Sequence, residues 1–501
     1  MLAASLTLDP AFRVAPVRRR TFGSFVEHMG RCVYTGIYEP GHPTADEDGF
    51  RKDVLELVRE LGVSVVRYPG GNFVSGYRWE DGVGPVAERP HRLDLAWHSL
   101  ETNEFGLGEF VRWAAKAGVE PMLALNLGTR GVQEAIDLLE YANVAGGTRW
   151  SELRRSHGAA DPYGIGLWCL GNELDGPWQL GHKTAREYGR LAAETAHAMR
   201  LVDRDLELVA CGSSNSGMPT FGRWEAEVLA EAFDHVDHIS CHAYYEPVDG
   251  DLASFLAAPV DLDRFVDSVV ATADHVAAVK RSRKRIGVSF DEWNVWYQSR
   301  HRAEEEPGDW PRAPRLIEDE YTAADAVVVG GLLIALLRHS DRVAVACQAQ
   351  LANVIAPIRS EPGGPAWRQT IFHPFALTSR LASGDVLQVP VVAPVVPTAR
   401  YGEVPVVDAV ATHDDDATTV FLVNRSLSEP VEVTVDGRAV APAGIAAQAW
   451  QLHDADLAAT NTERHPDRVV PRTDVDVRVD GGRVRLTLPA VSWTAVRLTP
   501  P

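Results

Sequence analysis

Two glutamates stand where short apolar runs end, at the points where a strand would leave the core and enter a site. One run ends in the sequence LGNE, whose last residue is Glu173, and another ends in FDEWN, which contains Glu292. Two carboxylates that face each other across a cleft are the groups that glycosidic bond cleavage requires, because one protonates the leaving oxygen while the other attacks or stabilises the oxocarbenium-like carbon. A lone glutamate at a strand end is more often a solvated acid or an ion-pair partner, but a pair in these two settings favours catalysis.

The elements that must position this pair alternate between two kinds over residues 20–383. Short apolar runs, many of them rich in Val and Ile, have the length of buried parallel strands. Longer stretches with apolar residues at spacings of three and four predict helices between most of them. The predicted strands are 23–27, 63–68, 121–127, 166–173, 206–211, 238–244, 286–292 and 342–349, and the predicted helices are 50–61, 108–117, 132–145, 184–202, 223–233, 262–280 and 318–337.

Repeated strand–helix units imply right-handed crossovers, and eight of them favour a closed (β/α)8 TIM barrel, an α/β fold, over a doubly wound open sheet. The functional residues of such a barrel stand at the C-terminal ends of its strands. The fourth and seventh strands lie on opposite sides of the ring. We therefore expect Glu173 and Glu292 to face each other.

The pattern changes after residue 384 to Val-rich alternation without a helical period. In residues 475–488, valines at every second position precede an Asp-Gly-Gly turn, and Val484, Leu486 and Leu488 follow it. This predicts a β-hairpin with one buried face and an antiparallel, jelly-roll-like β-sandwich. Further predicted strands are 386–396, 404–411, 418–423 and 431–435. The expected organisation is an N-terminal strand segment, 1–16, that adds an edge strand to the sandwich, a catalytic barrel, 17–383, and the C-terminal β-sandwich, 384–501.

Charge and cysteine usage exclude several classes of protein. There are 49 Lys and Arg against 69 Asp and Glu, a net charge of −20, which argues against nucleic acid and anionic membrane surfaces as partners. The five cysteines are odd in number and widely spaced without a CxxC pair, so a disulfide framework is not expected. The N-terminus lacks a basic leader pattern, and the most apolar helical stretch is too short to span a bilayer. We expect a cytoplasmic protein.

Signals for metals and cofactors are weak. No His pair has zinc spacing, and His242 is expected to be a hydrogen-bonding barrel residue rather than a ligand. Phosphate-cradle and dinucleotide fingerprints and the GxSxG elbow do not occur. We predict neither a metal nor a cofactor. Residues 300–315, with three consecutive glutamates and three prolines, are expected to form a mobile, solvated loop whose role the sequence does not define.

Six segments of the chain form a recognisable set: GSFVE at 23–27, RYPGGNF at 67–73, WCLGNELDGPW at 168–178, HAYY at 242–245, DEWN at 291–294 and AQLANVIAP at 349–357. In these segments, which follow the family order across essentially the whole chain, the protein resembles the α-L-arabinofuranosidases of glycoside hydrolase family 51. The resemblance implies a (β/α)8 barrel with a β-sandwich, retention of configuration, no cofactor and a homo-oligomer, expected to be a hexamer.

The resemblance also implies roles for individual residues. Glu173 matches the general acid/base of the family and Glu292 its nucleophile. This assignment requires the two carboxyl groups to lie about 5 Å apart, so that Glu292 can bond to the anomeric carbon. Glu173 must then be protonated in the first step and ionised in the second.

The remaining matched residues would build a furanose-sized pocket. Glu27 and Arg67 match residues that hydrogen-bond the sugar hydroxyls, although in isolation they could be a buried ion pair at the barrel mouth. Asn172 matches the residue that binds the 2-hydroxyl. Asn72 is a further candidate, at a position that varies in the family. Tyr244 would hold Glu292 through its hydroxyl, and Gln350 would complete the ring of hydrogen-bond donors. Apolar walls for the sugar or the leaving group would come from Trp97, Trp178 and Trp296, unless these are core residues.

The resulting hypothesis is an exo-acting, retaining α-L-arabinofuranosidase. It would release terminal non-reducing arabinofuranose from furanose-bearing oligosaccharides derived from arabinoxylan or arabinan. The same machinery could act on β-D-galactofuranosides, which differ by one exocyclic CH2OH. The sequence also allows a xylosidase or endoglucanase of the same clan, or a non-catalytic carbohydrate-binding protein, and the presence of both glutamates argues against the last. Linkage and chain-length preference stay open.

Overall fold

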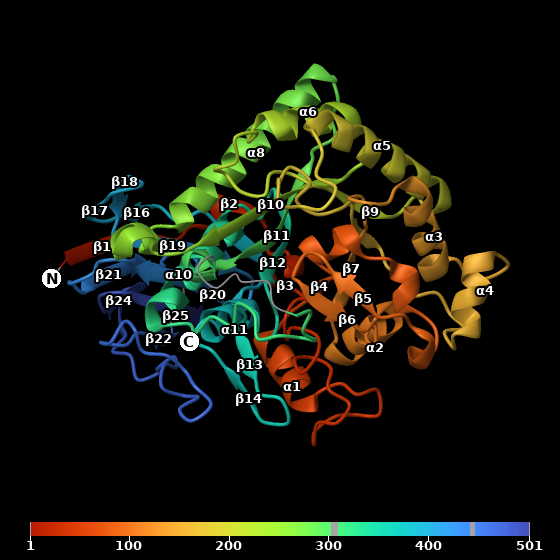
Figure 1. Ribbon diagram of the computed structural model, residues 1–501. Helices are drawn as coiled ribbons and strands as arrows, with labels where there is room; N and C mark the ends of the chain where they lie inside the picture. The colour runs from red at the N-terminus through yellow and green to blue at the C-terminus, as the bar shows by residue number, and fades with distance from the viewer. Residues whose placement is uncertain (1, 302–308, 441–445, 500–501) are drawn as a thin grey trace.

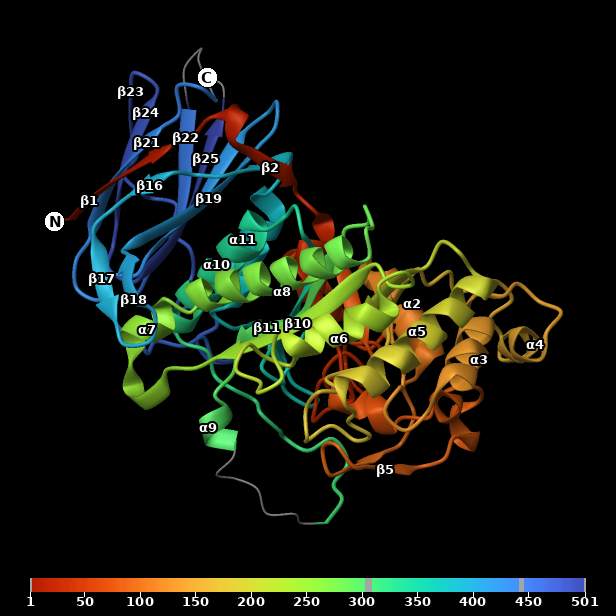
Figure 2. The ribbon, with the colours of Figure 1, turned by 90° about the horizontal axis from the view of Figure 1, so that it is seen from above.

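The computed structural model describes residues 2–301, 309–440 and 446–499. The centre of the loop predicted at 300–315 lies outside the described residues. Two bodies lie side by side in Figures 1 and 2, a barrel surrounded by helices and a β-sandwich that contains both the start and the end of the chain.

Eight parallel strands close into a barrel, which confirms the predicted TIM-barrel fold. Each predicted run overlaps one of these strands, and the largest extension is at β11, which continues to Val295 beyond the predicted end at residue 292. The residues that form them are short, largely apolar stretches buried along nearly their whole length, as expected for strands covered on both faces. In ring order the strands are β3 (Gly23–Phe25), β4 (Val65–Tyr68), β7 (Glu120–Ala124), β8 (Leu167–Cys169), β9 (Glu207–Ala210), β10 (His238–Tyr245), β11 (Gly287–Val295) and β12 (Val343–Ala349).

Helices stand where the apolar periodicity predicted them. These are α1 (Lys52–Leu61), α2 (Leu107–Ala117), α3 (Val132–Asn143), α5 (Ala185–Val202), α6 (Arg223–Ala232), α8 (Pro259–Val279) and α10 (Ala323–Arg338). The largest boundary difference is at α10, which was expected to begin at residue 318. It begins five residues later because Thr322 caps it: its hydroxyl accepts the backbone N–H of Asp325, whose carboxylate accepts the N–H of Thr322.

Four further helices of the described residues were not predicted. The buried residues of α4 (Arg149–Ser156) are the polar Ser151 and Arg154, and α11 (Phe372–Leu381) carries a proline in its first turn, so neither shows a clear amphipathic period. The other two are the short α7 (Leu252–Leu256) and α9 (Gln298–His301). Short 3-10 turns are η1 (Pro10–Phe12), η2 (Arg19–Phe22), η3 (Asn72–Gly76), η4 (Trp79–Gly82), η5 (Val86–Glu88) and η6 (Val248–Gly250).

Two sheets pack face to face in the sandwich. The six-stranded sheet has the order β2-β15-β19-β20-β25-β22 and the five-stranded sheet the order β16-β1-β21-β24-β23. Their strands are β1 (Leu2–Thr7), β2 (Arg13–Pro16), β15 (Asp385–Leu387), β16 (Val391–Val392), β19 (Val407–His413), β20 (Thr418–Asn424), β21 (Val431–Asp436), β22 (Ala446–Leu452), β23 (Arg478–Asp480), β24 (Arg483–Leu488) and β25 (Ser492–Thr499).

Three two-stranded hairpins lie outside these sheets and the barrel. They are β5 (Arg92–Asp94) with β6 (Ser99–Glu101), β13 (Ile358–Ser360) with β14 (Ala366–Arg368), and β17 (Val395–Thr398) with β18 (Gly402–Pro405). The β5–β6 hairpin is important for the site because the turn between its strands contains Trp97.

The N-terminal segment was predicted to add one edge strand to the sandwich. This prediction is wrong for β1, the first strand of the segment, because β1 is not at an edge. β1 lies inside the five-stranded sheet, parallel to β21 on one side and antiparallel to β16 on the other. β2 does form the edge of the six-stranded sheet, against β15. The N-terminal residues therefore contribute a strand to each sheet.

Two further predictions for the sandwich differ from the structure. The predicted strand 386–396 is divided among β15, β16 and β17, with breaks at Pro390 and Pro394, because proline cannot donate to a sheet ladder. The predicted hairpin at 475–488 is present with a turn at Gly481. However, its first arm is the exposed edge strand β23, and Val479 is 42% exposed, so only β24 has the expected buried face.

Helix α10 joins the two bodies. It is buried on all sides, packs against barrel strands β11 and β12, and also contacts β19, β20 and β25 of the sandwich. Gly330 makes the close approach possible, since a Cβ there would lie 2.1 Å from Cδ1 of Trp493. Within residues 2–301, 309–440 and 446–499, no helix combines the length and the apolar character needed to cross a membrane.

Candidate active site

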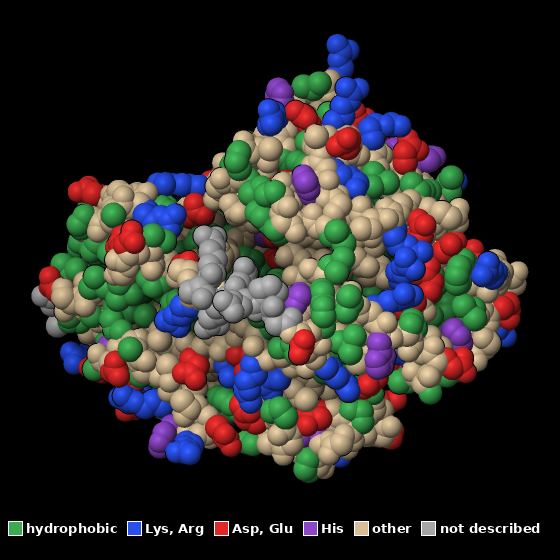
Figure 3. All heavy atoms as spheres, viewed as in Figure 1, with side chains coloured by type: hydrophobic (Ala, Val, Ile, Leu, Met, Phe, Trp, Pro, Cys, Tyr) green, Lys and Arg blue, Asp and Glu red, His purple; other side chains and the backbone are tan. Residues whose placement is uncertain are grey.

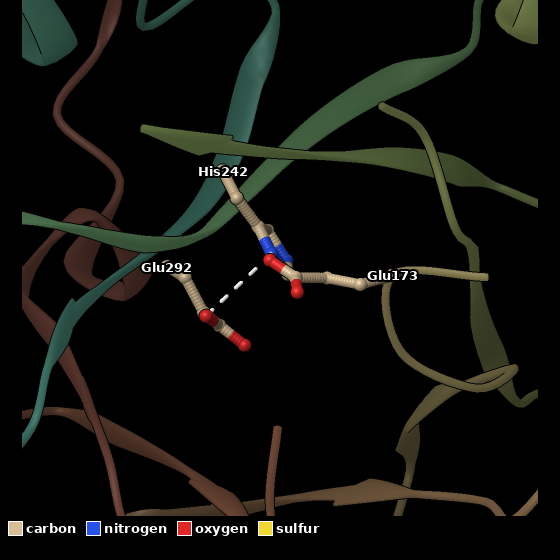
Figure 4. Close-up of side chains that lie close together, drawn as sticks. All are labelled: Glu173, His242 and Glu292. Carbon is tan, nitrogen blue, oxygen red and sulfur yellow. Dashed lines mark hydrogen bonds and ion pairs between the residues drawn. The ribbon is translucent and has the colours of Figure 1, made fainter. Parts of the chain in front are cut away.

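The predicted catalytic glutamates meet at the C-terminal end of the barrel. Glu292 lies within β11, whereas β8 ends at Cys169, so Glu173 stands in the loop that follows rather than on the strand itself. Figure 4 shows the two carboxylates pointing toward each other with His242 of β10 beside them. One oxygen of each glutamate and one nitrogen of His242 lie within 4.8 Å of one another. Retaining glycosidases place their carboxyl groups about 5–5.5 Å apart and inverting ones about 6.5–9.5 Å, so this arrangement suits retention.

Glu292 is held by hydrogen-bond donors on both of its oxygens. Arg67 of β4 donates from Nη1 to Oε1 at 2.6 Å, and the hydroxyl of Tyr244 on β10 donates to Oε2 at 2.8 Å. Burial raises the pKa of Glu292 above its ordinary value, because its effect outweighs the charges of His242 and Arg67, which lower it. The two hydrogen bonds fix the orientation of the carboxylate, as a nucleophile requires.

Glu173 is the more accessible member of the pair. The indole N–H of Trp178 donates to its Oε2 at 2.7 Å, and Nδ1 of His242 lies 2.9 Å from its Oε1. Its φ of 45° is in the left-handed region, which a side-chain-bearing residue adopts only when its surroundings hold it there. Trp178 is 51% exposed, so Oε2 faces the open side of the site.

His242 and Asp291 complete the cluster, and their position was not predicted. Nε2 of His242 lies 3.1 Å from Oδ1 of Asp291. The other oxygen of Asp291, Oδ2, lies 3.6 Å from Nε of Arg67. Burial lowers the pKa of His242, but the carboxylates of Glu292, Asp291 and Glu173 outweigh this effect and raise it to about 10. The motifs did contain a signal, since His242 is two residues before Tyr244 and Asp291 precedes Glu292. The sequence could not show that the two side chains meet.

The same cluster has the spacing of a three-ligand metal site. Glu173, His242 and Glu292 each offer one ligand atom. A metal-bound histidine, however, must present a neutral nitrogen lone pair. Both ring nitrogens of His242 face carboxylates, and its raised pKa keeps the imidazole protonated at neutral pH. The donor set therefore suits proton chemistry rather than metal binding.

A second group of predicted residues surrounds Glu27, which follows β3. Its Oε1 accepts the backbone N–H of Phe73 and the indole N–H of Trp97, both at 2.9 Å, and its Oε2 accepts from Gln350 at 3.1 Å. The Gly-Gly turn of RYPGGNF permits this approach, because a Cβ on Gly71 would lie 2.5 Å from the carboxylate. Glu27 and Arg67 thus have different partners, and the ion pair between them that the sequence also allowed is not what the contacts show.

The remaining candidates connect to the catalytic pair through one further contact. Arg67 donates from Nη2 to Oδ1 of Asn172 at 2.7 Å, and the Asn172 amide donates to Asn72 at 3.4 Å. Trp296 packs edge-to-face on Tyr244 with ring centroids 5.0 Å apart. In Figure 3 a hollow lies near the centre of the face shown, with acidic side chains visible inside it. These contacts therefore connect eight of the eleven predicted residues, the catalytic pair included. Glu27, Trp97 and Gln350 form the second group, which is close enough for the charge of Glu292 to raise the pKa of Glu27.

The fold and the site define a class, the glycoside hydrolases that act with retention on a (β/α)8 barrel. Comparison with known proteins specifies the family. Residues 57–259 match the model of the α-L-arabinofuranosidase 1 domain, and residues 291–492 match that of the α-L-arabinofuranosidase C-terminal domain. The chain belongs to the α-L-arabinofuranosidases of glycoside hydrolase family 51, which confirms the resemblance.

Relatives and solved structures agree over the full chain. It is 59% identical to an intracellular exo-α-(1→5)-L-arabinofuranosidase of Streptomyces lividans, over 100% of this chain and 76% of that protein. It is 57% identical to an exo-α-(1→6)-L-arabinofuranosidase of Bifidobacterium longum, over 98% of this chain and 97% of that protein. A solved family 51 α-L-arabinofuranosidase from Bifidobacterium longum superposes with a TM-score of 0.95 at 49% identity, covering 99% of both chains. The arabinose complex of the α-L-arabinofuranosidase from Thermotoga maritima superposes with a TM-score of 0.86 at 32% sequence identity, covering 100% of each chain.

Glu27 makes a testable contribution to stability. Burial raises its pKa from 4.5 to about 8. Between these values the folded protein keeps a proton that the unfolded chain has lost, so the contribution is complete below about pH 4.5 and decreases as the pH rises toward 8. Glu27→Gln cannot ionise. We expect its melting temperature, relative to the wild type, to increase between pH 5 and pH 8.

The matched control for this measurement is Glu56→Gln, which changes an exposed glutamate on α1. Its melting temperature should follow that of the wild type across the same range. If the difference between Glu27→Gln and the wild type were the same at pH 5 and pH 8, Glu27 would not be a buried, protonated carboxyl group.

Proposed function

We propose that the protein is a retaining, exo-acting α-L-arabinofuranosidase that releases terminal non-reducing arabinofuranosyl residues. The observation that carries this proposal is the separation of the Glu173 and Glu292 oxygens, within 4.8 Å, in a chain of this family. This separation leaves room for a sugar carbon to bond with Glu292 but not for a water molecule between the acid and the base of an inverting enzyme.

The reaction takes place in two displacements. In the first, the Glu292 carboxylate attacks the anomeric carbon while Glu173 transfers its proton to the glycosidic oxygen, so that the C–O bond to the leaving group breaks and a glycosyl ester forms. In the second, Glu173 as a carboxylate removes a proton from water, and the resulting attack on the anomeric carbon releases Glu292. Two inversions give net retention.

The surrounding residues have distinct proposed tasks. Arg67 and Tyr244 orient the Glu292 carboxylate for attack, through the two hydrogen bonds at 2.6 and 2.8 Å. Asn172, fixed by Arg67, would bind the 2-hydroxyl of the sugar, where a hydrogen bond strengthens in the transition state. The remaining sugar contacts are proposed for Glu27, Asn72 and Gln350, and the apolar walls for Trp97, Trp178 and Trp296.

The proposed substrates are oligosaccharides derived from arabinan or arabinoxylan. Relatives of almost equal identity are named for the α-(1→5) and the α-(1→6) linkage, so identity alone does not select one linkage. The relatives compared are named as arabinofuranosidases, and no observation favours β-D-galactofuranosides as substrates. Because relatives that cover the whole chain are named intracellular, we also propose that the enzyme acts in the cytoplasm on imported oligosaccharides, as a homo-oligomer and by family expectation a hexamer.

Initial rates on 4-nitrophenyl glycosides test the proposed specificity. We expect release from the α-L-arabinofuranoside, and rates lower by at least about 100-fold on the β-D-galactofuranoside and the β-D-xylopyranoside. Glu292→Ala is the control for contaminating activity and should abolish release. Equal or faster hydrolysis of either of the latter two glycosides would overturn the specificity, and no release from any of them would overturn the enzyme assignment.

Azide separates the roles of the two glutamates. Glu173→Ala should still form the glycosyl ester from substrates with good leaving groups, and azide should then attack that ester to give an arabinofuranosyl azide that retains the α configuration. In Glu292→Ala, azide can only replace the missing nucleophile, so any azide product should be the β anomer. NMR of the products distinguishes the two. An α-azide from Glu292→Ala would reverse the assignment.

A further inference from the structure

Asp291 and Glu292 are consecutive residues of β11, yet both side chains reach the same cluster. In a regular strand they would point to opposite faces of the sheet. The pairing of β11 shifts register twice here, against β12 between Phe290 and Trp293 and against β10 between Ser240 and His242. Such irregularities re-aim side chains beside active sites. Glu292 thereby takes the position facing Glu173, while Asp291 is placed behind His242.

The environment of Asp291 is closed and partly cationic. Its side chain is 1% exposed. Oδ1 lies 3.1 Å from Nε2 of His242, and Oδ2 accepts from the thiol of Cys169 at 3.5 Å and lies 3.6 Å from Nε of Arg67. Burial raises the pKa of Asp291, but the charges of Arg67 and His242 outweigh this and hold it below its ordinary value. Asp291 is therefore a permanent buried anion next to the catalytic pair.

The geometry around His242 favours a proton on each ring nitrogen. A neutral imidazole has one N–H and one acceptor nitrogen. Here Nε2 faces Asp291 at 3.1 Å and Nδ1 faces Glu173 at 2.9 Å, with Oε2 of Glu292 at 3.5 Å. The charged groups that act on the ring are these three carboxylates. Asp175, in the loop after β8, has a weaker electrostatic effect on the ring. The positive charge of Arg67 on β4 lies on the other side of Asp291 and partly balances the carboxylates.

This arrangement distinguishes the two oxygens of Glu173. Both oxygens accept a hydrogen bond, but from different donors. Oε1 accepts from the charged imidazolium of His242, which disfavours a proton on that oxygen. Oε2 accepts from the neutral indole of Trp178, on the open side of the site, and can carry a proton while it keeps that hydrogen bond. The proton that Glu173 gives to a leaving group must therefore be carried on Oε2 for as long as His242 keeps both of its protons.

We propose that Asp291 is a positioning residue: by holding His242 doubly protonated, it confines the catalytic proton of Glu173 to Oε2. The proposal rests on the retaining mechanism proposed above. Through both displacements His242 keeps its two protons, and the proton that moves passes from Oε2 to the leaving oxygen and returns to Oε2 from water. Asp291 itself neither gains nor loses a proton.

The substitution Asp291→Asn removes the charge and keeps the shape. The amide oxygen that it introduces can still accept the Nε2–H of His242, but the anion that retains the second proton is gone. A neutral His242 with its proton on Nε2 would present a bare Nδ1 to Glu173. The proton of Glu173 would then turn to Oε1 and toward His242, away from the leaving group.

The readout is the dependence of kcat/KM on the leaving group, measured with aryl α-L-arabinofuranosides and an arabino-oligosaccharide. For Asp291→Asn we expect a loss of less than about 3-fold on the 2,4-dinitrophenyl glycoside, which needs no acid, and of at least about 10-fold on the oligosaccharide. The larger deficit should decrease at lower pH, where His242 regains its second proton. The matched control, Cys169→Ala, removes a neighbouring hydrogen bond of Asp291 but no charge, and its effect should be the same for all substrates.

A uniform loss across leaving groups in Asp291→Asn, with no change in pH profile, would overturn the proposal and leave Asp291 a structural counter-ion of Arg67. Neutron diffraction of the wild-type protein locates the protons directly and does not depend on whether a variant folds. It should show hydrogen or deuterium on both ring nitrogens of His242 and none on Oε1 of Glu173. A singly protonated His242 would also overturn the proposal. If the wild type hydrolyses no arabinofuranoside, the proposed function fails, and the neutron result still decides the protonation of His242.

Discussion

The buried guanidinium of Arg67 is the interaction on which the rest of the site depends. Its side chain is 1% exposed, and it donates to Glu292 and Asn172 while lying 3.6 Å from Asp291 and over the ring of Phe25. A charge removed from water is tolerated only when it is paired and hydrogen-bonded, and the same applies to the two acids beside it. Arg67 and His242 together offset the buried carboxylates that the reaction needs.

This balance explains why the site is built on strands rather than on loops alone. Arg67, His242, Asp291 and Glu292 all come from β4, β10 and β11 of one closed barrel. Their backbones are fixed by ladder hydrogen bonds, so the charges cannot separate to regain water. Glu173 is the exception, in a loop after β8 and closer to solvent, which fits the one group whose proton must exchange in every cycle. Helix α10 packs against β11 and β12 on one side and against the sandwich on the other, and so connects these strands to the sandwich.

The sequence predicted those parts of the structure that depend on local pattern. The eight barrel strands follow from short buried runs, and the catalytic pair follows from the position of Glu173 and Glu292 at their ends. The sandwich was predicted less well because Pro390 and Pro394 divide an apparently continuous run and because β1 pairs with residues more than 400 positions away. The partners of Arg67 and the meeting of His242 with Asp291 depend on register shifts in β10 and β11, which no residue pattern encodes.

We propose that, of the two adjacent buried acids, Glu292 bonds to the sugar while Asp291 stays ionised beside His242. A cyclitol epoxide of α-L-arabinofuranose configuration would trap the nucleophile as a stable ester, and fragmentation mass spectrometry of the labelled peptide can separate neighbouring residues. The structure predicts a single label on Glu292, and no label in Glu292→Ala. A label on Asp291 or on Glu173 would contradict the account.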